Sequence, residues 1–333
     1  MKLIIPMAGR GTRVRPHSHT IPKPLLPVAG TMIVERIIET FARTLEKEIT
    51  EIVFILGPDF GKDIKNKLRG MSERHNAKAF FKIQETALGT AHAVACAEEK
   101  LEGEAIIVFA DTIFDTDETV SLEGADSVIW LKEVDDPSRF GVAVHEDDKI
   151  TGFVEKPSEP ISNLAIIGVY YFKNVENLMK EIQYLLDNNI KGHGGEYQLT
   201  DALDRLLKQG KIFKKATVDE WLDCGTLPAW LDATSQILEK ENHLFGTYEN
   251  TTIHPPVFIG KDVKIKDSEI GPGVSIEAGT SIDASKISES IIQEEAAIKH
   301  CTLNRSTVGN FTEIENVSGT IHAGDHTIIQ QES

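Results

Sequence analysis

The sequence predicts an α/β protein that continues into a parallel β-helix. In the first two-thirds of the chain, strand-like apolar runs alternate with amphipathic segments, which is typical of a mostly parallel sheet with helices on both faces. After about residue 245, isoleucine, valine or leucine recurs every five or six residues, a period that no α-helix has. We therefore expect a Rossmann-like, mixed and mostly parallel sheet over residues 1–242 and a left-handed β-helix of hexapeptide repeats over residues 243–333.

The alternating region supplies the elements of the expected sheet. Segment 32–45 places Ile37, Ile38 and Phe41 on one helical face. The apolar runs expected to form strands are 3–6, 51–56, 79–83, 105–110, 127–132, 141–144 and 164–172. The expected helices are 32–45, 90–100, 175–186, 198–208 and 228–241.

The repetitive region fits a triangular coil in which each short side contributes one inward aliphatic residue. Ile259, Ile276, Ile292 and Val308 follow one another at sixteen or seventeen residues, the length of one coil. The full inward series is Ile253, Ile259, Ile265, Ile270, Ile276, Ile282, Ile287, Ile292, Ile298, Leu303, Val308 and Ile314. About four coils are visible, and each is stabilised by stacking on its neighbour.

Composition limits the partners of the chain. A formal net charge of −17 repels nucleic acid and anionic membranes, so basic groups gathered in one loop indicate a small anionic ligand. The three cysteines have neither zinc spacing nor a disulfide framework, which suits a reducing cytoplasm. The sequence shows no secretory leader and no membrane-spanning apolar run, and we expect a cytoplasmic protein.

The most unusual stretch is LIIPMAGRGTRVRPHSHTIPKPLLPVAG, residues 3–30. Gly9 and Gly11 leave room for backbone N–H groups to approach phosphate oxygens. Arg13 offers a planar guanidinium, and Lys23, between two prolines, offers a compact charge. The spacings GxGxxG and GxxxxGK[ST] are both absent, which excludes a dinucleotide fingerprint and a Walker loop. We interpret the stretch as a phosphate-binding loop at the carboxyl end of a central strand.

This stretch also carries a family resemblance. PMAGRGTR followed by IPKPLLPVAG resembles the signature of the sugar-1-phosphate nucleotidyltransferases, roughly AGGxGTR and PKxLLPV. The one residue fewer between Ala8 and Thr12 makes it more similar to the UTP–glucose-1-phosphate uridylyltransferases than to the glucose-1-phosphate thymidylyltransferases. The resemblance covers essentially the whole chain and implies catalytic roles for Arg13 and Lys23. The nucleotide-binding residues that it implies here are Ala8, Gly9, Gly11, Thr12 and Arg13.

The motif QETALGTAHAV, residues 84–94, would bind the base. The resemblance implies that Gln84 hydrogen-bonds the base and that Gly89 and Thr90 lie against the nucleotide. A primary amide can donate and accept toward a pyrimidine imide edge. Since guanylyltransferases of the family more often carry an acid at this position, Gln84 favours dTTP or UTP.

Two aspartates are the expected metal ligands. Asp111 follows the apolar run 105–110, where a carboxylate is costly unless something pairs with it. Mg²⁺ on a triphosphate supplies that pairing, because it prefers hard oxygen ligands. The resemblance places the metal on Asp111, which would also be catalytic, and on Asp223 in EWLDCGT.

A further group would bind the sugar phosphate. Carboxylates and amides suit ring hydroxyl groups, and a lysine suits the phosphate. The residues that the resemblance assigns are Gly141, Glu155, Lys156, Asn163, Gly168 and Glu196. Several thymidylyltransferases carry an arginine two residues before this glutamate, whereas this chain has Gly194, so His193 or another group must handle the phosphate here.

Histidines raise two other possibilities. His17 and His19 have the spacing of a metal pair, but no third ligand lies near them in sequence, and we expect a solvated loop. His300, His322 and His326 fall in the expected coil, and some family members fuse an acetyltransferase coil to this enzyme. The coil here is short and has no evident acyl-CoA loop, so we do not expect acyl transfer.

The resemblance thus predicts a Mg²⁺-dependent transfer of a nucleoside monophosphate from dTTP or UTP to a sugar 1-phosphate, with glucose 1-phosphate favoured. Mannose-1-phosphate guanylyl transfer is the alternative within the class. A non-catalytic, nucleotide-sugar-binding regulatory paralogue is the alternative outside it. Because β-helices of relatives mediate assembly, we also expect a homo-oligomer.

Overall fold

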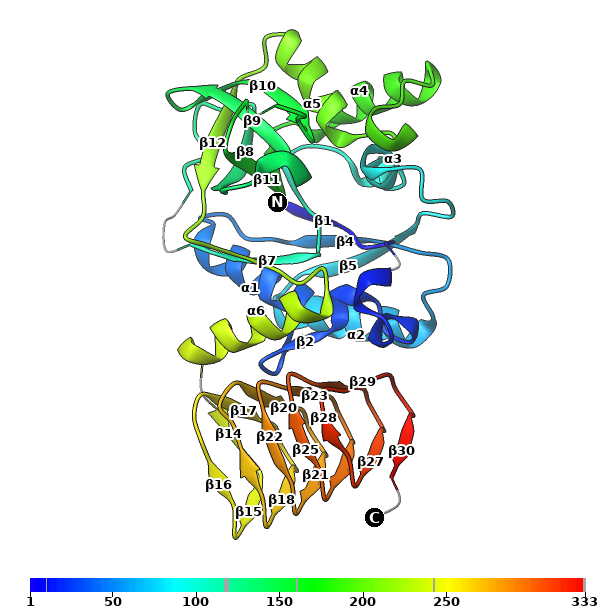
Figure 1. Ribbon diagram of the computed structural model, residues 1–333. Helices are drawn as coiled ribbons and strands as arrows, with labels where there is room; N and C mark the ends of the chain where they lie inside the picture. Colours follow the sequence, from blue (N-terminus) through cyan, green and yellow to red (C-terminus); the bar gives the residue numbers. More distant parts are fainter. Residues whose placement is uncertain (10, 117–119, 160, 242, 332–333) are drawn as a thin grey trace. The chain divides into compact units, whose positions relative to one another are not determined.

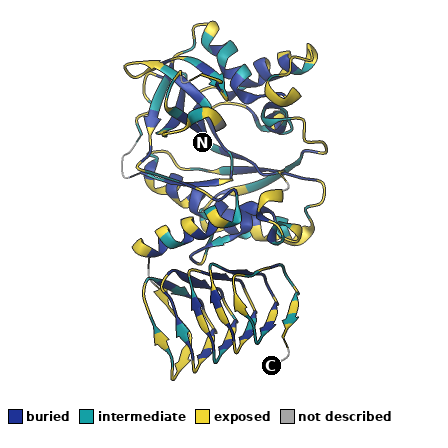
Figure 2. Cartoon of the chain, viewed as in Figure 1, coloured by how far each residue is buried: buried dark blue, intermediate teal, exposed yellow. Residues whose placement is uncertain are grey.

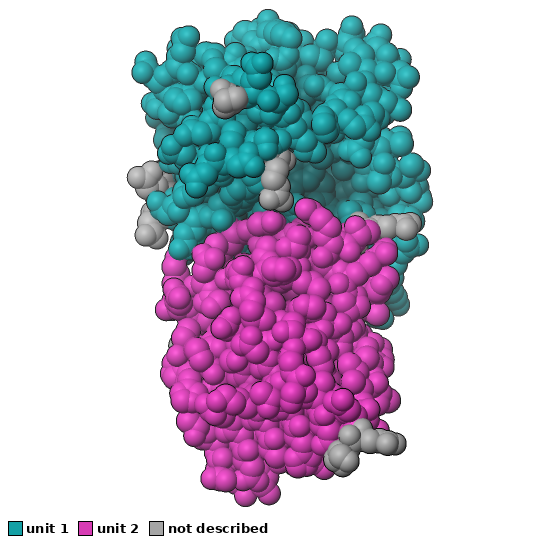
Figure 3. Space-filling view, viewed as in Figure 1, with its two compact units in different colours: residues 1–9, 37–221 teal, residues 10–36, 222–333 magenta. Residues whose placement is uncertain are grey.

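The computed structural model describes residues 1–9, 11–116, 120–159, 161–241 and 243–331 (Figure 1). Contacts divide the chain into two compact units (Figure 3). Unit 1 comprises residues 1–9 and 37–221, and unit 2 comprises residues 10–36 and 222–333. The predicted fold class is confirmed in both parts, whereas a domain boundary at residues 242 and 243 stays a prediction.

Unit 1 is built on a nine-stranded sheet with the order β5-β4-β1-β6-β11-β8-β12-β10-β9. β5, β4, β1 and β6 are parallel neighbours, and β11 then runs antiparallel to β6 and β8. The bounds are β1 Lys2–Pro6, β4 Glu51–Leu56, β5 Lys78–Ile83, β6 Ala105–Val108, β8 Ser127–Glu133, β9 Gly141–Glu146, β10 Lys149–Glu155, β11 Leu164–Phe172 and β12 Phe213–Thr217. β1 lies inside the sheet, between β4 and β6. Leu3, Ile4 and Ile5 are fully buried there, because a continuous apolar run must be covered on both faces of the sheet.

Helices cover both faces of this sheet. On one face, Val94, Ile182 and Leu203 of three helices pack in one cluster with Ile4 and Ile107 of the sheet. On the other face, the Phe41 ring packs edge-on against Phe114 and Trp130. The helices are α1 Ile33–Thr44, α2 Lys62–Arg74, α3 Thr90–Ala95, α4 Val175–Asp187, α5 Leu199–Lys208 and α6 Leu227–Lys240, the last in unit 2.

Some elements differ from the prediction. α2 was not predicted, because it buries only Leu68, Met71 and Ser72 and shows no long apolar stripe. α3 ends at Ala95, and Glu98–Lys100 form a single 3₁₀ turn. Only the first part of the predicted helix 90–100 is therefore α-helical. β10 and β12 were missed, as were β7 Thr112–Asp115 and β13 Glu220–Asp223, which form a separate two-stranded sheet.

In unit 2, three parallel sheets form the predicted β-helix (Figure 1). The register places Ile259 beside Ile276 and Ile276 beside Ile292, as the coil period predicts. These residues form a continuous buried core (Figure 2). The strands are β14 His243–Leu244, β15 Thr247–Glu249, β16 Thr252–Ile253, β17 Val257–Ile259, β18 Lys264–Lys266, β19 Glu269–Ile270, β20 Val274–Ile276, β21 Ser281–Asp283, β22 Lys286–Ser288, β23 Ile291–Ile292, β24 Ala297–Lys299, β25 Thr302–Asn304, β26 Thr307–Val308, β27 Glu313–Glu315, β28 Ser318–Gly319, β29 His322–Ala323 and β30 Ile328–Gln330.

The β-helix is longer than the aliphatic series indicated. Pairing extends to His243 at one end and to Gln330 at the other. The inward positions of the end coils carry other residues, such as Gly319 opposite Leu303. Terminal repeats are commonly atypical because they cap the stack.

Unit 2 also contains residues 10–36, with the short hairpin of β2 Pro27–Val28 and β3 Thr31–Met32. One expectation about this stretch is wrong: His17 does not lie in a solvated loop but is fully buried, whereas His19 is exposed. A search of the described helices finds none with the length and apolar character that crossing a bilayer requires.

Candidate active site

Several predicted site residues follow the carboxyl ends of parallel strands in unit 1. Ala8 and Gly9 follow β1, Gln84 follows β5, and Asp111 follows β6. Because the carboxyl ends of parallel strands meet at one edge of a sheet, these residues lie at the edge where open α/β sheets bind ligands. A side chain added at Gly9 would meet no atom within 4 Å, so the backbone there is open to approach.

Gln84 is 7% exposed, and its amide group has a fixed orientation. Its Nε2 atom lies 3.4 Å from the Gly89 carbonyl oxygen and 3.0 Å from Nδ1 of His92. A carbonyl oxygen can only accept, so the amide NH₂ must face Gly89, and Nδ1 of His92 must accept as well. Burial lowers the pKa of His92 below 6.5, which favours the neutral ring that this bond needs.

The orientation of Gln84 leaves its carbonyl oxygen available. Among the residues that the structure describes, none donates a hydrogen bond to Oε1 of Gln84. Nor is this oxygen one of the buried side-chain atoms that lack a hydrogen-bond partner, so it is accessible from outside the protein. An oriented acceptor that is accessible at the carboxyl edge of the sheet can bind a ligand N–H group.

Backbone contacts join the base motif to the segment that contains Glu196. Gly89 has a φ of +119°, and a side chain there would come within 2.5 Å of the Tyr197 carbonyl oxygen, so only glycine fits. The Tyr197 N–H donates to Leu88, and the Ala91 N–H donates to Tyr197, each at 2.9 Å. Thr90 Oγ1 accepts from the Leu199 N–H at 2.9 Å. Glu196 is exposed beside this joint.

A second group gathers around the start of α5. Oε2 of Glu155, at the end of β10, accepts a hydrogen bond from Oγ1 of Thr200 at 3.1 Å. A side chain at Gly141 would lie 2.9 Å from the same carboxylate oxygen, so glycine lets that carboxylate approach the backbone. The structure therefore brings Gly141, Glu155 and the α5 segment after Glu196 together.

The remaining predicted sugar-site residues have fewer contacts that join them to this group. Gly168 sits at a bulge of β11, where a side chain would touch Phe109, two residues before Asp111. Lys156 is exposed directly after β10. The Asn163 amide donates to Glu133 and, as far as the structure describes the chain, makes no side-chain hydrogen bond to Glu155 or Glu196.

The predicted phosphate-binding residues of unit 2 lie on or directly beside two short 3₁₀ turns. We call residues 11–25 the phosphate loop. Gly11 has a φ of +56° and precedes the turn Thr12–Val14, on which Thr12 and Arg13 are exposed. Lys23 lies on the turn Lys23–Leu25 and is only 7% exposed.

Asp223 belongs to unit 2 and is oriented by its own backbone turn. Its Oδ1 atom accepts the Gly225 N–H at 2.7 Å. A side chain at Gly225 would lie 2.7 Å from this carboxylate and 3.2 Å from the Arg13 guanidinium, so Gly225 lets Asp223 and Arg13 approach the same backbone. This places one predicted metal ligand beside one predicted phosphate ligand.

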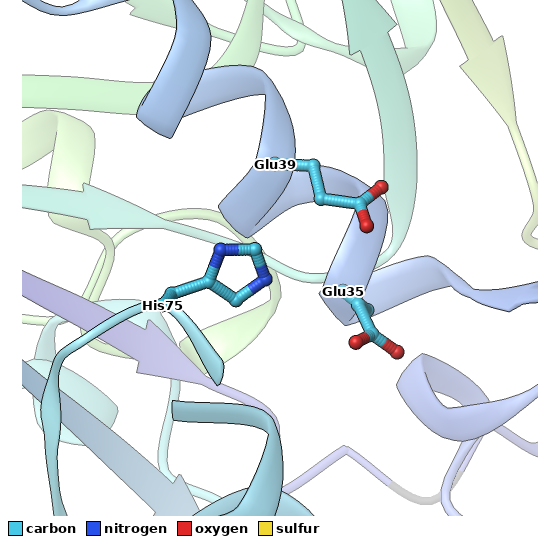
Figure 4. A group of neighbouring side chains, drawn as sticks. All are labelled: Glu35, Glu39 and His75. Atoms are coloured by element: carbon cyan, nitrogen blue, oxygen red, sulfur yellow. The ribbon is translucent and has the colours of Figure 1, made fainter. Parts of the chain in front are cut away.

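Asp111 in unit 1 and Asp223 in unit 2 each offer a group that suits a divalent cation. Both side chains are exposed carboxylates, which are the hard oxygen ligands that Mg²⁺ prefers in combination with phosphates. Another group with metal-ligating side chains, Glu35, Glu39 and His75, is drawn in Figure 4. Glu35, half-buried, and Glu39, exposed, lie one turn apart on α1. Accessible acidic groups are common without an ion, so we assign no metal to this group.

Three residues that contribute to these arrangements were not predicted. His92 fixes the amide of Gln84, Thr200 holds Glu155, and Gly225 admits Asp223. His92 and Gly225 lie inside motifs that the sequence singles out, eight and two residues from the predicted ligands. Only the fold brings Thr200 to Glu155, because 45 residues separate them in sequence.

Known proteins are similar to this chain over most of its length. A family model described as nucleotidyl transferase matches residues 2–240. Bifunctional protein GlmU of Methanococcus maripaludis is 34% identical over 257 residues, 75% of this chain and 58% of that protein. This chain thus spans less than two thirds of that relative.

A second relative covers both parts of the chain. Glucose-1-phosphate thymidylyltransferase of Streptomyces antibioticus is 28% identical over 371 aligned residues, 100% of both chains. Among solved structures, UDP-glucose pyrophosphorylase complexed with UDP-glucose gives a TM-score of 0.59 at 23% identity, over 72% of this chain and 99% of that one. At this level of identity, the similarity to the solved structure concerns the fold alone.

Proposed function

Since this chain belongs to the nucleotidyl transferase family, we propose that it transfers a nucleoside monophosphate from dTTP or UTP to a sugar 1-phosphate, with glucose 1-phosphate favoured. An oxygen of the sugar phosphate forms a new bond to the α-phosphorus. The bond from that phosphorus to the pyrophosphate oxygen breaks, and pyrophosphate leaves. The product is a nucleotide sugar.

The orientation of Gln84 is the observation that carries the choice of base. Its NH₂ group is engaged by Gly89 and His92, so the base meets an acceptor, Oε1. Uracil and thymine carry an N–H at ring position 3, which can donate to this oxygen. Cytosine has an unprotonated ring nitrogen there and would leave two acceptors facing each other, which is unfavourable.

Support for the sugar comes from the second group in unit 1. Glu155, oriented by Thr200, and the exposed Glu196 supply acceptors for ring hydroxyl groups. The thymidylyltransferase relative is named for glucose 1-phosphate, which favours this sugar. Gly141, Lys156, Asn163 and Gly168 remain proposed members of the sugar-phosphate site.

Arg13 and Lys23 would act on the triphosphate. Two cations near the departing pyrophosphate stabilise the negative charge that grows there as the bond breaks. A bound Mg²⁺ would neutralise phosphate charge, and Asp111 and Asp223 would hold it. A phosphate nucleophile is already ionised at neutral pH, so no residue of this chain needs to remove a proton.

Pyrophosphate release tests this proposal directly. The protein is assayed with Mg²⁺, each of dTTP, UTP, CTP, ATP and GTP, and glucose, mannose, galactose or N-acetylglucosamine 1-phosphate. We expect turnover with dTTP or UTP, strongest with glucose 1-phosphate, and loss of turnover in Asp111→Asn. Full activity of Asp111→Asn would remove the metal assignment.

The same assay separates the alternatives. Turnover with GTP and mannose 1-phosphate alone would identify a guanylyltransferase. Nucleotide-sugar binding without pyrophosphate release from any pair would identify a non-catalytic regulatory paralogue. The presence of Arg13, Lys23, Asp111 and Asp223 together favours an enzyme over that paralogue.

We also propose that the protein forms a homo-oligomer through the β-helix. Large apolar side chains are exposed there, including Phe311 at 52% and Ile328 at 65%. A single species of monomer mass in sedimentation at micromolar concentration would contradict this assembly.

A further inference from the structure

Within unit 2, the phosphate loop is attached to the β-helix by a closed network of buried hydrogen bonds centred on His17. We propose that His17 is a positioning residue through which the β-helix holds the phosphate loop in the geometry that nucleotidyl transfer needs. The inference rests on the proposed function. It adds that the β-helix takes part in catalysis and does not serve assembly alone.

The network has a defined direction. The Asn310 amide NH₂ donates to Oδ1 of Asp325 at 3.1 Å and to Oε1 of Gln293 at 3.4 Å. Because the oxygen of Gln293 therefore faces Asn310, its NH₂ group faces Nδ1 of His17, at 2.8 Å. Nδ1 of His17 accepts, so the ring proton sits on Nε2 and is donated to Oγ1 of Thr307 at 2.8 Å.

The centre of the network is buried. His17 and Thr307 are fully buried, and Gln293 is 1% exposed. The Trp230 ring lies edge-on to His17 at 5.2 Å between ring centroids. Burial lowers the pKa of His17 to about 4, so the ring stays neutral and keeps its single donor at physiological pH.

Neighbouring contacts attach the same stretch to the same β-helix. Thr20 donates to the Asp325 carboxylate at 2.7 Å. A side chain at Gly324 would lie 3.0 Å from Pro16, so the coil backbone and the loop touch there. Near the hairpin that follows, a side chain at Gly30 would lie 2.2 Å from the Phe258 ring, so only glycine fits.

A short chain of contacts leads from His17 to the predicted phosphate ligands. Ser18, the next residue, donates to the Gly11 carbonyl oxygen at 2.7 Å. Gly11 precedes the turn that carries Arg13, and a side chain at Gly11 would lie 3.0 Å from Cβ of Lys23. Displacement of His17 would therefore move the backbone on which both cations stand.

The consequence for catalysis is specific. Misplacing charged groups by about 1 Å can cost about 100-fold in rate. Arg13 and Lys23 are proposed to act on charge that develops as pyrophosphate leaves, so their displacement lowers kcat more than it changes binding of the second substrate. The proposed sugar-site residues belong to unit 1, and the KM for the sugar 1-phosphate is therefore expected to stay constant.

The test compares His17→Ala and Thr307→Val with a matched control, Ser285→Ala. Ser285 is also buried in the β-helix, and its hydroxyl group bonds the backbone of Asp283 and of Cys301. Among the described residues, it makes no side-chain hydrogen bond to residues 11–25. We expect kcat to fall about 10- to 100-fold in the first two variants, with the KM for the sugar 1-phosphate within about twofold of native. In Ser285→Ala, kcat stays native.

The double variant sharpens this test. If His17 acts through Thr307, combining both substitutions costs no more in kcat than the larger single loss. Thr307→Val keeps the shape of the side chain and serves where His17→Ala fails to fold. A kcat within about twofold of native for folded Thr307→Val, or an equal loss in Ser285→Ala, overturns the proposal.

Hydrogen exchange separates this proposal from the function on which it rests. In His17→Ala and Thr307→Val, amide exchange in residues 11–25 is expected to accelerate about tenfold, but not in Ser285→Ala. No turnover by the native protein would remove the proposed function and leave this measurement intact. Unchanged exchange in residues 11–25 would remove the anchoring role of His17.

Discussion

The two units each contain a histidine and a glutamine joined in the same way, yet the two pairs have different surroundings. In unit 1, Nε2 of Gln84 lies 3.0 Å from Nδ1 of His92. In unit 2, Nε2 of Gln293 lies 2.8 Å from Nδ1 of His17. In both pairs the amide NH₂ donates to Nδ1, and burial lowers the pKa of each ring, which favours the neutral form that can accept this bond.

The difference lies in the amide oxygen. Oε1 of Gln293 accepts from Asn310, so every polar group of that pair is satisfied within the protein. Oε1 of Gln84 accepts from none of the described residues, so this oxygen is available to a ligand. We call Gln293 with His17 the closed pair and Gln84 with His92 the open pair. A closed pair rigidifies structure, whereas an open pair indicates binding.

Replacing Gln84 should have the largest effect. Gln84→Leu removes the oriented acceptor, and we expect kcat/KM for dTTP or UTP to fall about 100-fold. The melting temperature should fall less than in a variant of Gln293, because His92 is only partly buried and water can replace the lost amide. The matched control is Gln209→Leu, since Gln209 is exposed and bonds only Glu181 through its side chain. An equal kcat/KM in the two variants would show that the open pair does not read the base.

Replacing Gln293 should act on stability instead. Gln293→Leu leaves Nδ1 of His17 and one Asn310 donor without their partner, and burying such groups unpaired costs about 2 kcal/mol. Thermal unfolding of Gln293→Leu and Gln209→Leu measures the cost. Equal melting temperatures would show that the closed pair is not structural.

Replacing His92 should weaken the selectivity for the base. In His92→Phe the amide of Gln84 loses one of its two fixed partners and can turn its NH₂ group toward the base. We expect the preference for UTP over CTP to fall about tenfold, which corresponds to about 1.4 kcal/mol, one hydrogen bond. A preference unchanged from native would assign the orientation of Gln84 to Gly89 alone.

The smallest expected effect is on pH dependence. Protonation of His92 would place a donor opposite the NH₂ group of Gln84, so base binding weakens only below the lowered pKa. The dissociation constant for UTP should therefore change less than about twofold from pH 8 to pH 6.5 and rise below it. His92→Phe corrects for protonation of the triphosphate itself, and an equal rise in that variant would contradict the role of His92.

Much of the fold could be predicted because its signals are periodic. The coil register at Ile259, Ile276 and Ile292 follows from spacing alone, since each coil repeats one environment. α2 is harder to predict in this way, because it lies half exposed and its apolar stripe is limited to Ile64, Leu68 and Met71. Nor does any local pattern reveal that residues 10–36 pack with the β-helix, because 276 residues separate His17 from Gln293.

The candidate site could be predicted where ligands sit inside local motifs. Gln84 and Gly89 occupy one loop, and the structure places them within one hydrogen bond of each other. The sequence wrongly predicts a solvated His17, because distant coils contribute the partners of this residue. A buried polar residue can be recognised only when its partners are known.

The most direct test of base selection by Gln84 is the ratio of kcat/KM for UTP to that for CTP, measured on native protein and on His17→Ala with one sugar 1-phosphate. We predict a ratio of about 100 or more for native protein, set by the pair of Gln84 and His92, and the same ratio in His17→Ala despite its lower kcat. Equal use of CTP and UTP by native protein would contradict it.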